Sequence, residues 1–126
     1  MKRLVLFALL LLVSLSLFAA DIPKTPAGNA LTAWLESFNT HDVATRRQWL
    51  TEHTSLPKEK IERFASIDVE MREENGTLEV TSVTATGDNA VTASLETKSG
   101  VELSIEITVD AAEPHRITNT TLRRRG

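Results

Sequence analysis

The residues best suited to chemistry near neutral pH are the three histidines, His41, His53 and His115. A local metal motif would place two histidines on neighbouring turns of one helix, whereas these three are scattered along the chain. The sequence therefore predicts no metal site and no cofactor, although a site assembled by folding stays open. His53 is expected near the end of a helix, where a cation is favourable.

Ser55 and Lys58 match the Ser-x-x-Lys string of penicillin-recognising serine enzymes. That chemistry also needs separate Ser-Asp-Asn and Lys-Thr-Gly elements, and the sequence contains neither. Ser55 is expected instead to cap the helix that follows it. The sequence thus predicts no serine nucleophile.

Carboxylates offer no clearer catalytic group. Glu73 and Glu74 fall at an expected helix end, and general acid–base catalysis needs a carboxyl in a partly apolar site. The chain has no cysteine and no tyrosine, which removes thiol chemistry and a tyrosine donor to an oxyanion. We predict that the chain is not an enzyme. The best alternative acid–base pair is His41 with Asp42.

Three helices are predicted in the first half of the mature chain. Thr25 is a suitable N-cap with Pro26 at the first helical position, and Asp42 caps a second helix that runs to about His53. A third helix ends at Asn75-Gly76. The apolar residues expected on one face of the first helix are Leu31, Trp34, Leu35 and Phe38, and those of the third are Ile61, Phe64 and Ala65.

Four β-strands are predicted after Gly76, because runs rich in Val, Ile and Thr alternate with turn residues. The runs cover residues 77–86, 90–97, 101–109 and 116–122. A shift of the apolar phase between Val80 and Val83 indicates a bulge. The third run alternates most regularly, with one apolar face made of Val101, Leu103, Ile105, Ile107 and Val109.

The predicted fold class is therefore α+β, with N-terminal helices packed on a curved four-stranded antiparallel meander. Four large apolar residues are candidates to line either the core or a pocket of this fold: Trp34, Phe38, Trp49 and Leu103. The helical spacing of Trp34, Phe38, Trp49 and Phe64 favours the core.

The first 20 residues have the features of a secretory signal peptide. A positive start, Met1-Lys2-Arg3, precedes an apolar run, and Ala19-Ala20 precedes a polar segment. A membrane anchor needs about 20 consecutive apolar residues, and this run is shorter, so an uncleaved anchor is the alternative. We predict cleavage, no membrane span in the mature protein, a single domain over residues 21–126, and a secreted or periplasmic location.

The charge of the chain excludes one class of partner. The formal net charge is −3 over the whole chain, and loss of Lys2 and Arg3 with the signal would take it to −5. Proteins that bind nucleic acids carry a basic surface, so no nucleic-acid partner is predicted. The basic cluster Arg123-Arg124-Arg125 is interpreted as a solvated end of the chain.

Several strings resemble one known family. They are residues 25–31, Trp34-Leu35-Glu36-Ser37-Phe38-Asn39, Asp42, and the turn 109–117 with its Pro114-His115-Arg116 motif. They resemble an N-terminal accessory module, nuclear-transport-factor-two-like or cystatin-like, of exported bacterial serine hydrolases. Those hydrolases are β-lactamase-related enzymes and tail-specific proteases. The resemblance implies a cone of helices in a curved sheet and no catalytic residue.

The same resemblance implies an accessory or binding role for this chain. In the family a hydrolase domain usually follows, so the chain is expected to be either a free-standing module or a fragment of a longer serine hydrolase or tail-specific protease. The expected partner is a protein or a small apolar ligand held in the mouth of the cone. A small isomerase or dehydratase is the rival function, and a homodimer through the polar outer sheet face is a further alternative.

Overall fold

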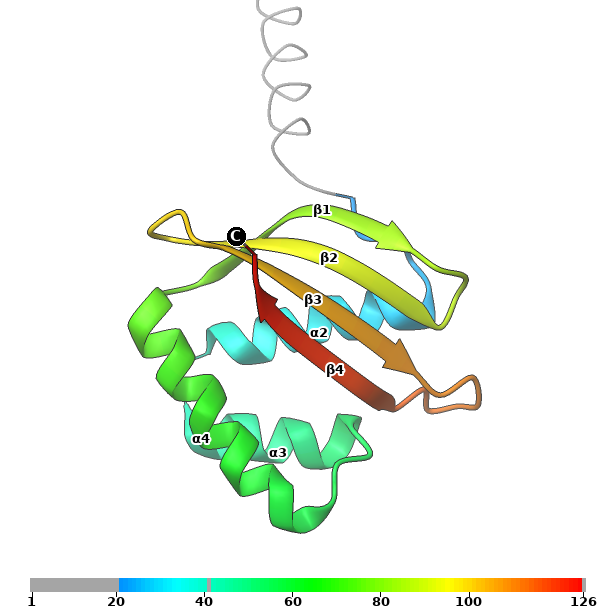
Figure 1. The fold of residues 1–126 in the computed structure, drawn as a ribbon. Coiled ribbons are helices and arrows are strands. Elements are labelled where there is room, and N and C mark those ends of the chain that lie inside the picture. The colour runs from blue at the N-terminus through cyan, green and yellow to red at the C-terminus, as the bar shows by residue number, and fades with distance from the viewer. Residues whose placement is uncertain (1–20, 41, 126) are drawn as a thin grey trace, which may run out of the picture.

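A computed structural model describes residues 21–40 and 42–125 of the protein. The predicted signal peptide, residues 1–20, and His41 lie outside the described residues. Within the described residues, three helices precede four strands, and the helices lie on one side of the sheet (Figure 1). The elements are α2 (Pro26–Asn39), α3 (Val43–His53), α4 (Lys58–Asn75), β1 (Leu78–Ala85), β2 (Ala90–Thr97), β3 (Glu102–Val109) and β4 (Ile117–Arg124).

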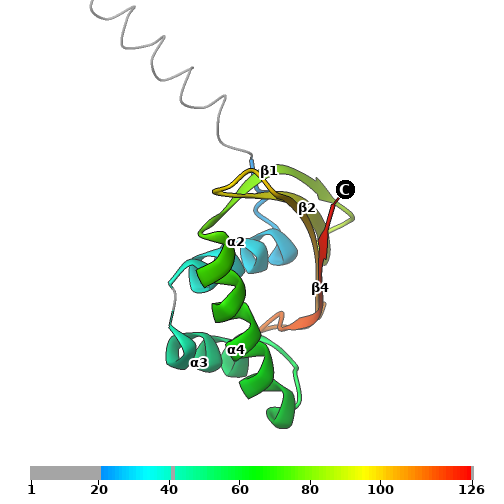
Figure 2. The ribbon, with the colours of Figure 1, turned by 60° about the vertical axis from the view of Figure 1, so that its left-hand side comes forward.

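The sheet is an antiparallel meander in which the strands lie in sequence order, β1-β2-β3-β4. It curves around the helices (Figure 2). The pairing of β1 with β2 shifts between Val80 and Ser82, which confirms the predicted bulge. A second shift, between Thr108 and Val109, lies where β4 begins. The α+β class with a curved meander is thus confirmed.

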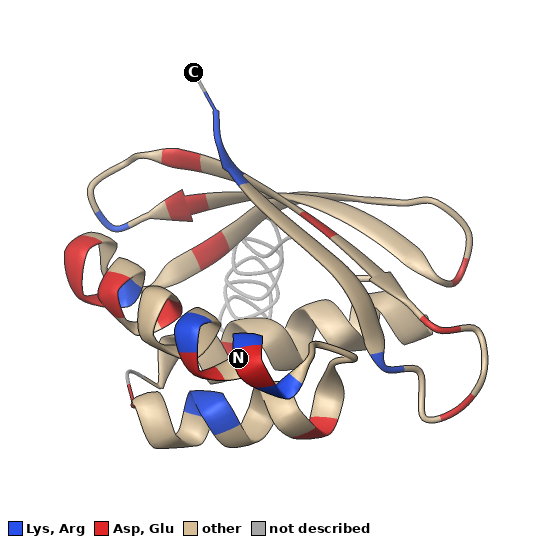
Figure 3. Cartoon of the chain, turned by 60° about the horizontal axis from the view of Figure 1, so that its bottom comes forward, with Lys and Arg blue, Asp and Glu red and all other residues tan. Residues whose placement is uncertain are grey.

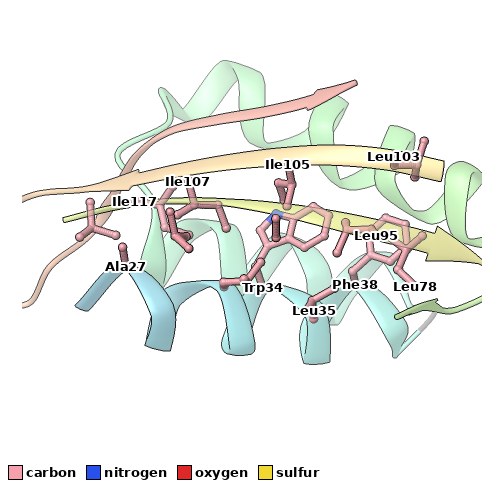
Figure 4. Close-up of a cluster of buried hydrophobic side chains, with 14 residues drawn as sticks. Ala27, Trp34, Leu35, Phe38, Leu78, Leu95, Leu103, Ile105, Ile107 and Ile117 are labelled. Atoms are coloured by element: carbon pink, nitrogen blue, oxygen red, sulfur yellow. The ribbon is translucent and has the colours of Figure 1, made fainter. Parts of the chain in front are cut away.

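The core forms between α2 and the concave face of the sheet (Figure 4). Trp34 and Phe38 of α2 stack with ring centroids 5.1 Å apart and face the apolar side of β3. Every second residue of β3 is buried, as the alternation predicts: Leu103, Ile105, Ile107 and Val109. Each such fully buried aliphatic side chain stabilises the fold by roughly 1.5–3 kcal/mol relative to its exposed state.

Local signals determine where the helices begin. The Thr25 hydroxyl accepts a hydrogen bond from Gly28 N–H, and the Asp42 carboxylate accepts from Ala44 and Thr45 N–H, so both predicted caps are confirmed. The prediction that Ser55 caps the third helix is wrong. Its N–H and its hydroxyl both donate to Ile117 C=O, because the segment before Pro57 pairs with the sheet instead.

Helix α4 packs on α3 through a small cluster of its own, made of Leu50, Ile61 and Ala65. An exposed ion pair between Arg47 and Glu62 also joins the two helices. The packing of α4 on α3 leaves space between α4 and the last strand, β4, in which a candidate site lies.

Candidate functional site

A cavity of about 600 Å³ lies between α4 and β4. We call it the groove. One wall is a face of α4, the other is residues 117–122 of β4, and the floor includes Trp34 and Leu50. Figure 2 shows α4 and β4 on opposite sides of this space. The residues that α4 contributes are Lys60, Phe64, Ile67, Asp68 and Met71.

The sequence of α4 explains why it presents apolar side chains to the groove. Positions 60, 64, 67, 68 and 71 recur at the spacing of one helical face. A second apolar stripe, Ile61 and Ala65, packs against α3. Two stripes cannot both be buried by one neighbour, so the groove stripe stays open. Phe64 and Ile67 are 40% and 38% exposed, and the expectation that Phe64 belongs to the core is wrong.

A buried ion pair lies beside the groove. Arg46 of α3 is 1% exposed, and its Nε lies 2.8 Å from Oδ2 of Asp68, whose side chain is 15% exposed. Arg46 Nη1 also donates to Trp34 C=O at 3.2 Å. The guanidinium carbon lies 4.8 Å from the Trp34 ring centroid and 5.0 Å from that of Trp49, at cation–π distance from both. This contact ties α2, α3 and α4 together.

One nitrogen of this arginine is not satisfied by the surrounding chain. Arg46 Nη2 is buried and has no hydrogen-bond partner among residues 21–40 and 42–125. The contacts of the guanidinium with the rings of Trp34, Phe38 and Trp49 offset part of the desolvation of the cation.

Burial also changes the titration of the pair. Burial raises the pKa of Asp68 above its ordinary value, although the Arg46 cation and its hydrogen bond act in the opposite direction. Burial lowers the pKa of Arg46, and Asp68 opposes that change. A guanidinium nevertheless stays charged across the physiological range. The groove wall therefore carries a carboxyl group whose proton affinity is increased.

The β4 wall is an edge of the sheet, because β4 pairs with β3 on one side and ends the strand order. On its other side, the first residue of β4 meets the segment before α4, where Thr54 and Ile117 form a parallel bridge. Leu122 is partly buried and packs against the core, while Thr118, Asn119 and Thr120 are exposed. The edge thus adds hydroxyl and amide groups to an otherwise apolar groove.

A second, smaller cavity of about 370 Å³ lies beside the C-terminal end of α3, where Trp49, Glu52 and His53 line it. The predicted motif turn lines it: Pro114, His115 and Arg116 lie there with Trp49 and His53. His115 adopts a positive φ of 57°, and its Nδ1 lies 2.9 Å from Asp110 C=O. Arg116 Nη1 donates to Thr54 C=O at 3.4 Å. These contacts hold the turn against α3.

The four candidate lining residues do not meet in one site. Trp34, Phe38 and Leu103 are buried in the main core, and of these only Trp34 also lines the groove. Trp49 is half-buried, packs against both clusters and lines the smaller cavity. Asp42 is an exposed helix cap. Its proposed partner His41 lies outside the described residues.

Sequence reasoning did not find Arg46 or the groove face of α4. The spacing of positions 60, 64, 67, 68 and 71 was a usable signal for the latter. Nothing in the pattern of α3 marks Arg46 as its most buried residue.

Neither a metal centre nor a transmembrane helix emerges from the described part of the chain. Within residues 21–40 and 42–125, no group of three or more His, Asp or Glu side chains could hold a metal ion. Over the same residues, no helix combines the length and the apolar character that crossing a bilayer requires.

Fold and groove together define an α+β domain in which three helices and a curved antiparallel meander leave an apolar groove at the sheet edge. A family described as ORF 12 gene product N-terminal matches residues 22–114, and the chain belongs to this family. The matched residues cover all three helices and β1–β3, together with most of the turn before β4. No curated protein matches the chain.

Proposed function

We propose that this protein is an exported, non-catalytic accessory domain that binds a partner segment or a small apolar ligand in the groove between α4 and β4. The observation that carries the proposal is the exposure of Phe64 and Ile67 inside a cavity of about 600 Å³. Ligand sites are commonly concave, mostly apolar and of roughly 300–1,000 Å³, with a few polar groups that orient the ligand.

The non-catalytic part of the proposal is supported by what the candidate groups do in the fold. The Ser55 hydroxyl donates to Ile117 C=O, Asp42 caps α3, and Asp68 accepts from Arg46. Each is therefore used for structure. The family description refers to the N-terminal part of a gene product, which is compatible with an accessory module.

Binding of the fluorescent apolar probe N-phenyl-1-naphthylamine tests the groove. We expect saturable binding that the double variant Phe64→Gln/Ile67→Gln abolishes, because both changes place an amide on the apolar wall. Ala85→Gln, at an exposed site on the opposite edge strand, is the control and should bind normally. Equal binding by the natural protein and both variants would show that the probe does not bind in the groove.

Export is tested by the intact mass of the protein from the extracellular or periplasmic fraction of its native host. A species of roughly 11–12 kDa is expected if residues 1–20 are removed from the 13.9 kDa chain. A much heavier species with the same N-terminus would support the alternative that the chain is a fragment of a longer serine hydrolase or tail-specific protease. A mass of the full chain in a membrane fraction would support an uncleaved anchor.

One observation favours a second function, that of a small isomerase or dehydratase. Asp68 lines an apolar groove and its pKa is raised by burial, which is the environment of a general acid or base. Exchange of solvent deuterium into the α-carbon of apolar ketones, followed by proton NMR, tests this function. Exchange by the natural protein that Asp68→Asn eliminates would favour it over the non-catalytic proposal.

A further inference from the structure

We infer that the occupant of the groove is an extended peptide that pairs with β4 as a fifth strand. The apolar side chains of the peptide would point into the groove at alternate positions. Its carboxylates would lie at the end of the peptide that is near Arg124 of β4. This inference depends on the proposed function, in which the groove is a binding site, and it names the class of partner.

The first argument is the unpaired backbone of β4. Arg125 N–H donates to Glu102 C=O, so residue 125 faces β3. In an antiparallel ladder the backbone groups of successive residues point alternately to the two sides. The N–H and C=O of residues 120, 122 and 124 therefore point away from β3. Since β4 is the last strand of the sheet, these groups form a row to which another strand can bond.

The second argument is that the chain itself begins such a pairing. Ser55 N–H donates to Ile117 C=O, and Thr54 forms a parallel bridge with Ile117. Pro57 and α4 then direct the chain away from the edge. The backbone of β4 thus already pairs with another segment at residue 117. The rest of this edge, residues 118–122, borders the groove.

The third argument compares the two edges of the sheet. The other edge strand, β1, is interrupted by a bulge between Val80 and Ser82, near its middle. Bulges of this kind hinder strand addition. The irregularity of β4 lies at its beginning, and its pairing with β3 is regular from Asn119 to Arg124. Of the two edges, β4 is the one that can accept a strand over several residues.

Side-chain direction links this edge to the apolar wall. Thr120 and Leu122 pair with Ile107 and Ile105, whose side chains are in the core, so the first two also face the concave side. An added strand continues the same alternation. Every second side chain of the peptide would then enter the groove, where Phe64 and Ile67 are exposed.

Charge indicates the composition of the peptide. Arg123 and Arg124 are exposed at the end of β4, and Figure 3 shows this basic end beside the C terminus. Lys60, in the first turn of α4 near the start of β4, adds a positive charge at the other end of the groove. The acidic group of the groove wall, Asp68, is already paired with Arg46. A peptide with carboxylates near Arg124 therefore complements the site, and a basic peptide does not.

Fluorescence anisotropy with defined peptides tests the inference. The probes are short, capped, fluorescein-labelled peptides of alternating valine and threonine, with two glutamates at either the N-terminal or the C-terminal end. Binding of at least one of them is expected. N-methylation of those alternate backbone nitrogens of the peptide that would face β4 should weaken peptide binding at least tenfold. Replacement of the two glutamates by lysines should also weaken it at least tenfold.

Proline variants of the protein give the matched control. Thr120→Pro removes an N–H that points away from β3, a position where an edge strand tolerates proline. Ala85→Pro makes the corresponding change on β1, because Thr86 N–H faces β2 and residue 85 therefore faces away. We expect Thr120→Pro to weaken peptide binding at least tenfold and Ala85→Pro to leave it unchanged. Circular dichroism verifies that both fold.

The outcomes separate this inference from the proposed function. If N-methylated and unmodified peptides bind equally, strand addition is wrong and the groove binds by side chains alone. If no peptide binds while N-phenyl-1-naphthylamine does, the occupant is a small ligand and only the inference fails. If neither probe binds, both fail. Should Thr120→Pro not fold, the N-methylated peptides decide the question with the natural protein.

Discussion

Arg46 and Asp68 join α3 to α4 through a contact of 2.8 Å between Nε and Oδ2, at the wall of the groove. The same guanidinium lies over the rings of Trp34 and Trp49. The position of the α4 wall relative to the floor of the groove therefore depends on a charge that is 1% exposed. This arrangement makes the stability of the fold and the shape of the groove interdependent.

Removal of one partner of this ion pair should be strongly destabilising. Asp68→Ala leaves the Arg46 cation buried without its carboxylate, and we expect a loss of about 3–5 kcal/mol in the free energy of unfolding. The double variant Arg46→Met/Asp68→Leu removes both charges and should recover most of that loss. Urea unfolding of the three proteins measures the effect. A double variant as unstable as Asp68→Ala would show that the unpaired Arg46 cation is not the cause of the loss.

The pKa values of Asp42 and Asp68 should be shifted in opposite directions from the ordinary value of an aspartate. The hydroxyl and N–H of Thr45 donate to Asp42 and lower its pKa below the ordinary 3.8, whereas burial raises the pKa of Asp68. Carbon-13 NMR titration of the carboxyl groups should find Asp42 below 3.8 and Asp68 above it. An Asp68 pKa below 3.8 would show that pairing with Arg46, rather than burial, governs its titration.

These shifts also determine how each group affects stability with pH. Asp42 has a lowered folded-state pKa, so its contribution is present above pH 3.8 and is lost as the pH falls through that lowered pKa. Asp68 has a raised folded-state pKa, so the part of the stability that depends on its protonation is fully present below pH 3.8 and is lost as the pH rises through the raised value, while the contact with Arg46 remains. The stability difference between the natural protein and Asp42→Ala should accordingly shrink in acid.

The elements could be predicted from sequence because their signals are local. Thr25 and Asp42 each cap a helix with their own side chain, and Gly76, with a φ of 76°, supplies the backbone conformation that ends α4. The alternation of β3 survives intact as alternate burial. Such features require knowledge of only a few neighbouring residues.

The groove could not be predicted in the same way, because it depends on how far α4 stands from β4. That distance is set by the packing of Leu50, Ile61 and Ala65 and by the Arg46 contact, all of which are long-range. Phe64 has the helical spacing of a core residue, and only the position of α4 leaves it 40% exposed. The role of Ser55 could not be predicted locally either, because its partner, Ile117, is remote in sequence.

Gly28 should be intolerant of a side chain even though it lies within α2. Alanine in a helix is usually more stable than glycine by about 0.5–1 kcal/mol. A Cβ at residue 28 would, however, lie 1.8 Å from Pro23 C=O, so the segment before the helix would have to move. We expect Gly28→Ala to lower the melting temperature. In a chain trimmed to begin at Lys24 the same change should raise it, which identifies Pro23 as the cause.

Trp34 and Phe64 both line the groove, yet their replacement should have different consequences. Trp34 is 3% exposed, and Trp34→Ala should cost about 3–5 kcal/mol of unfolding free energy, as large aromatic truncations in cores do. Phe64 is 40% exposed, so Phe64→Ala should cost less than about 1 kcal/mol. Urea unfolding gives both values.

Binding measurements on the same two variants complete the comparison. Phe64→Ala should stay folded and lose affinity for the apolar probe, because the groove wall is removed without disturbing the core. If Phe64→Ala instead destabilises the protein as much as Trp34→Ala, then α4 closes onto β4 in solution and Phe64 is a core residue. Retained stability with full affinity would place the binding site elsewhere, with the cavity beside His115 as the next candidate.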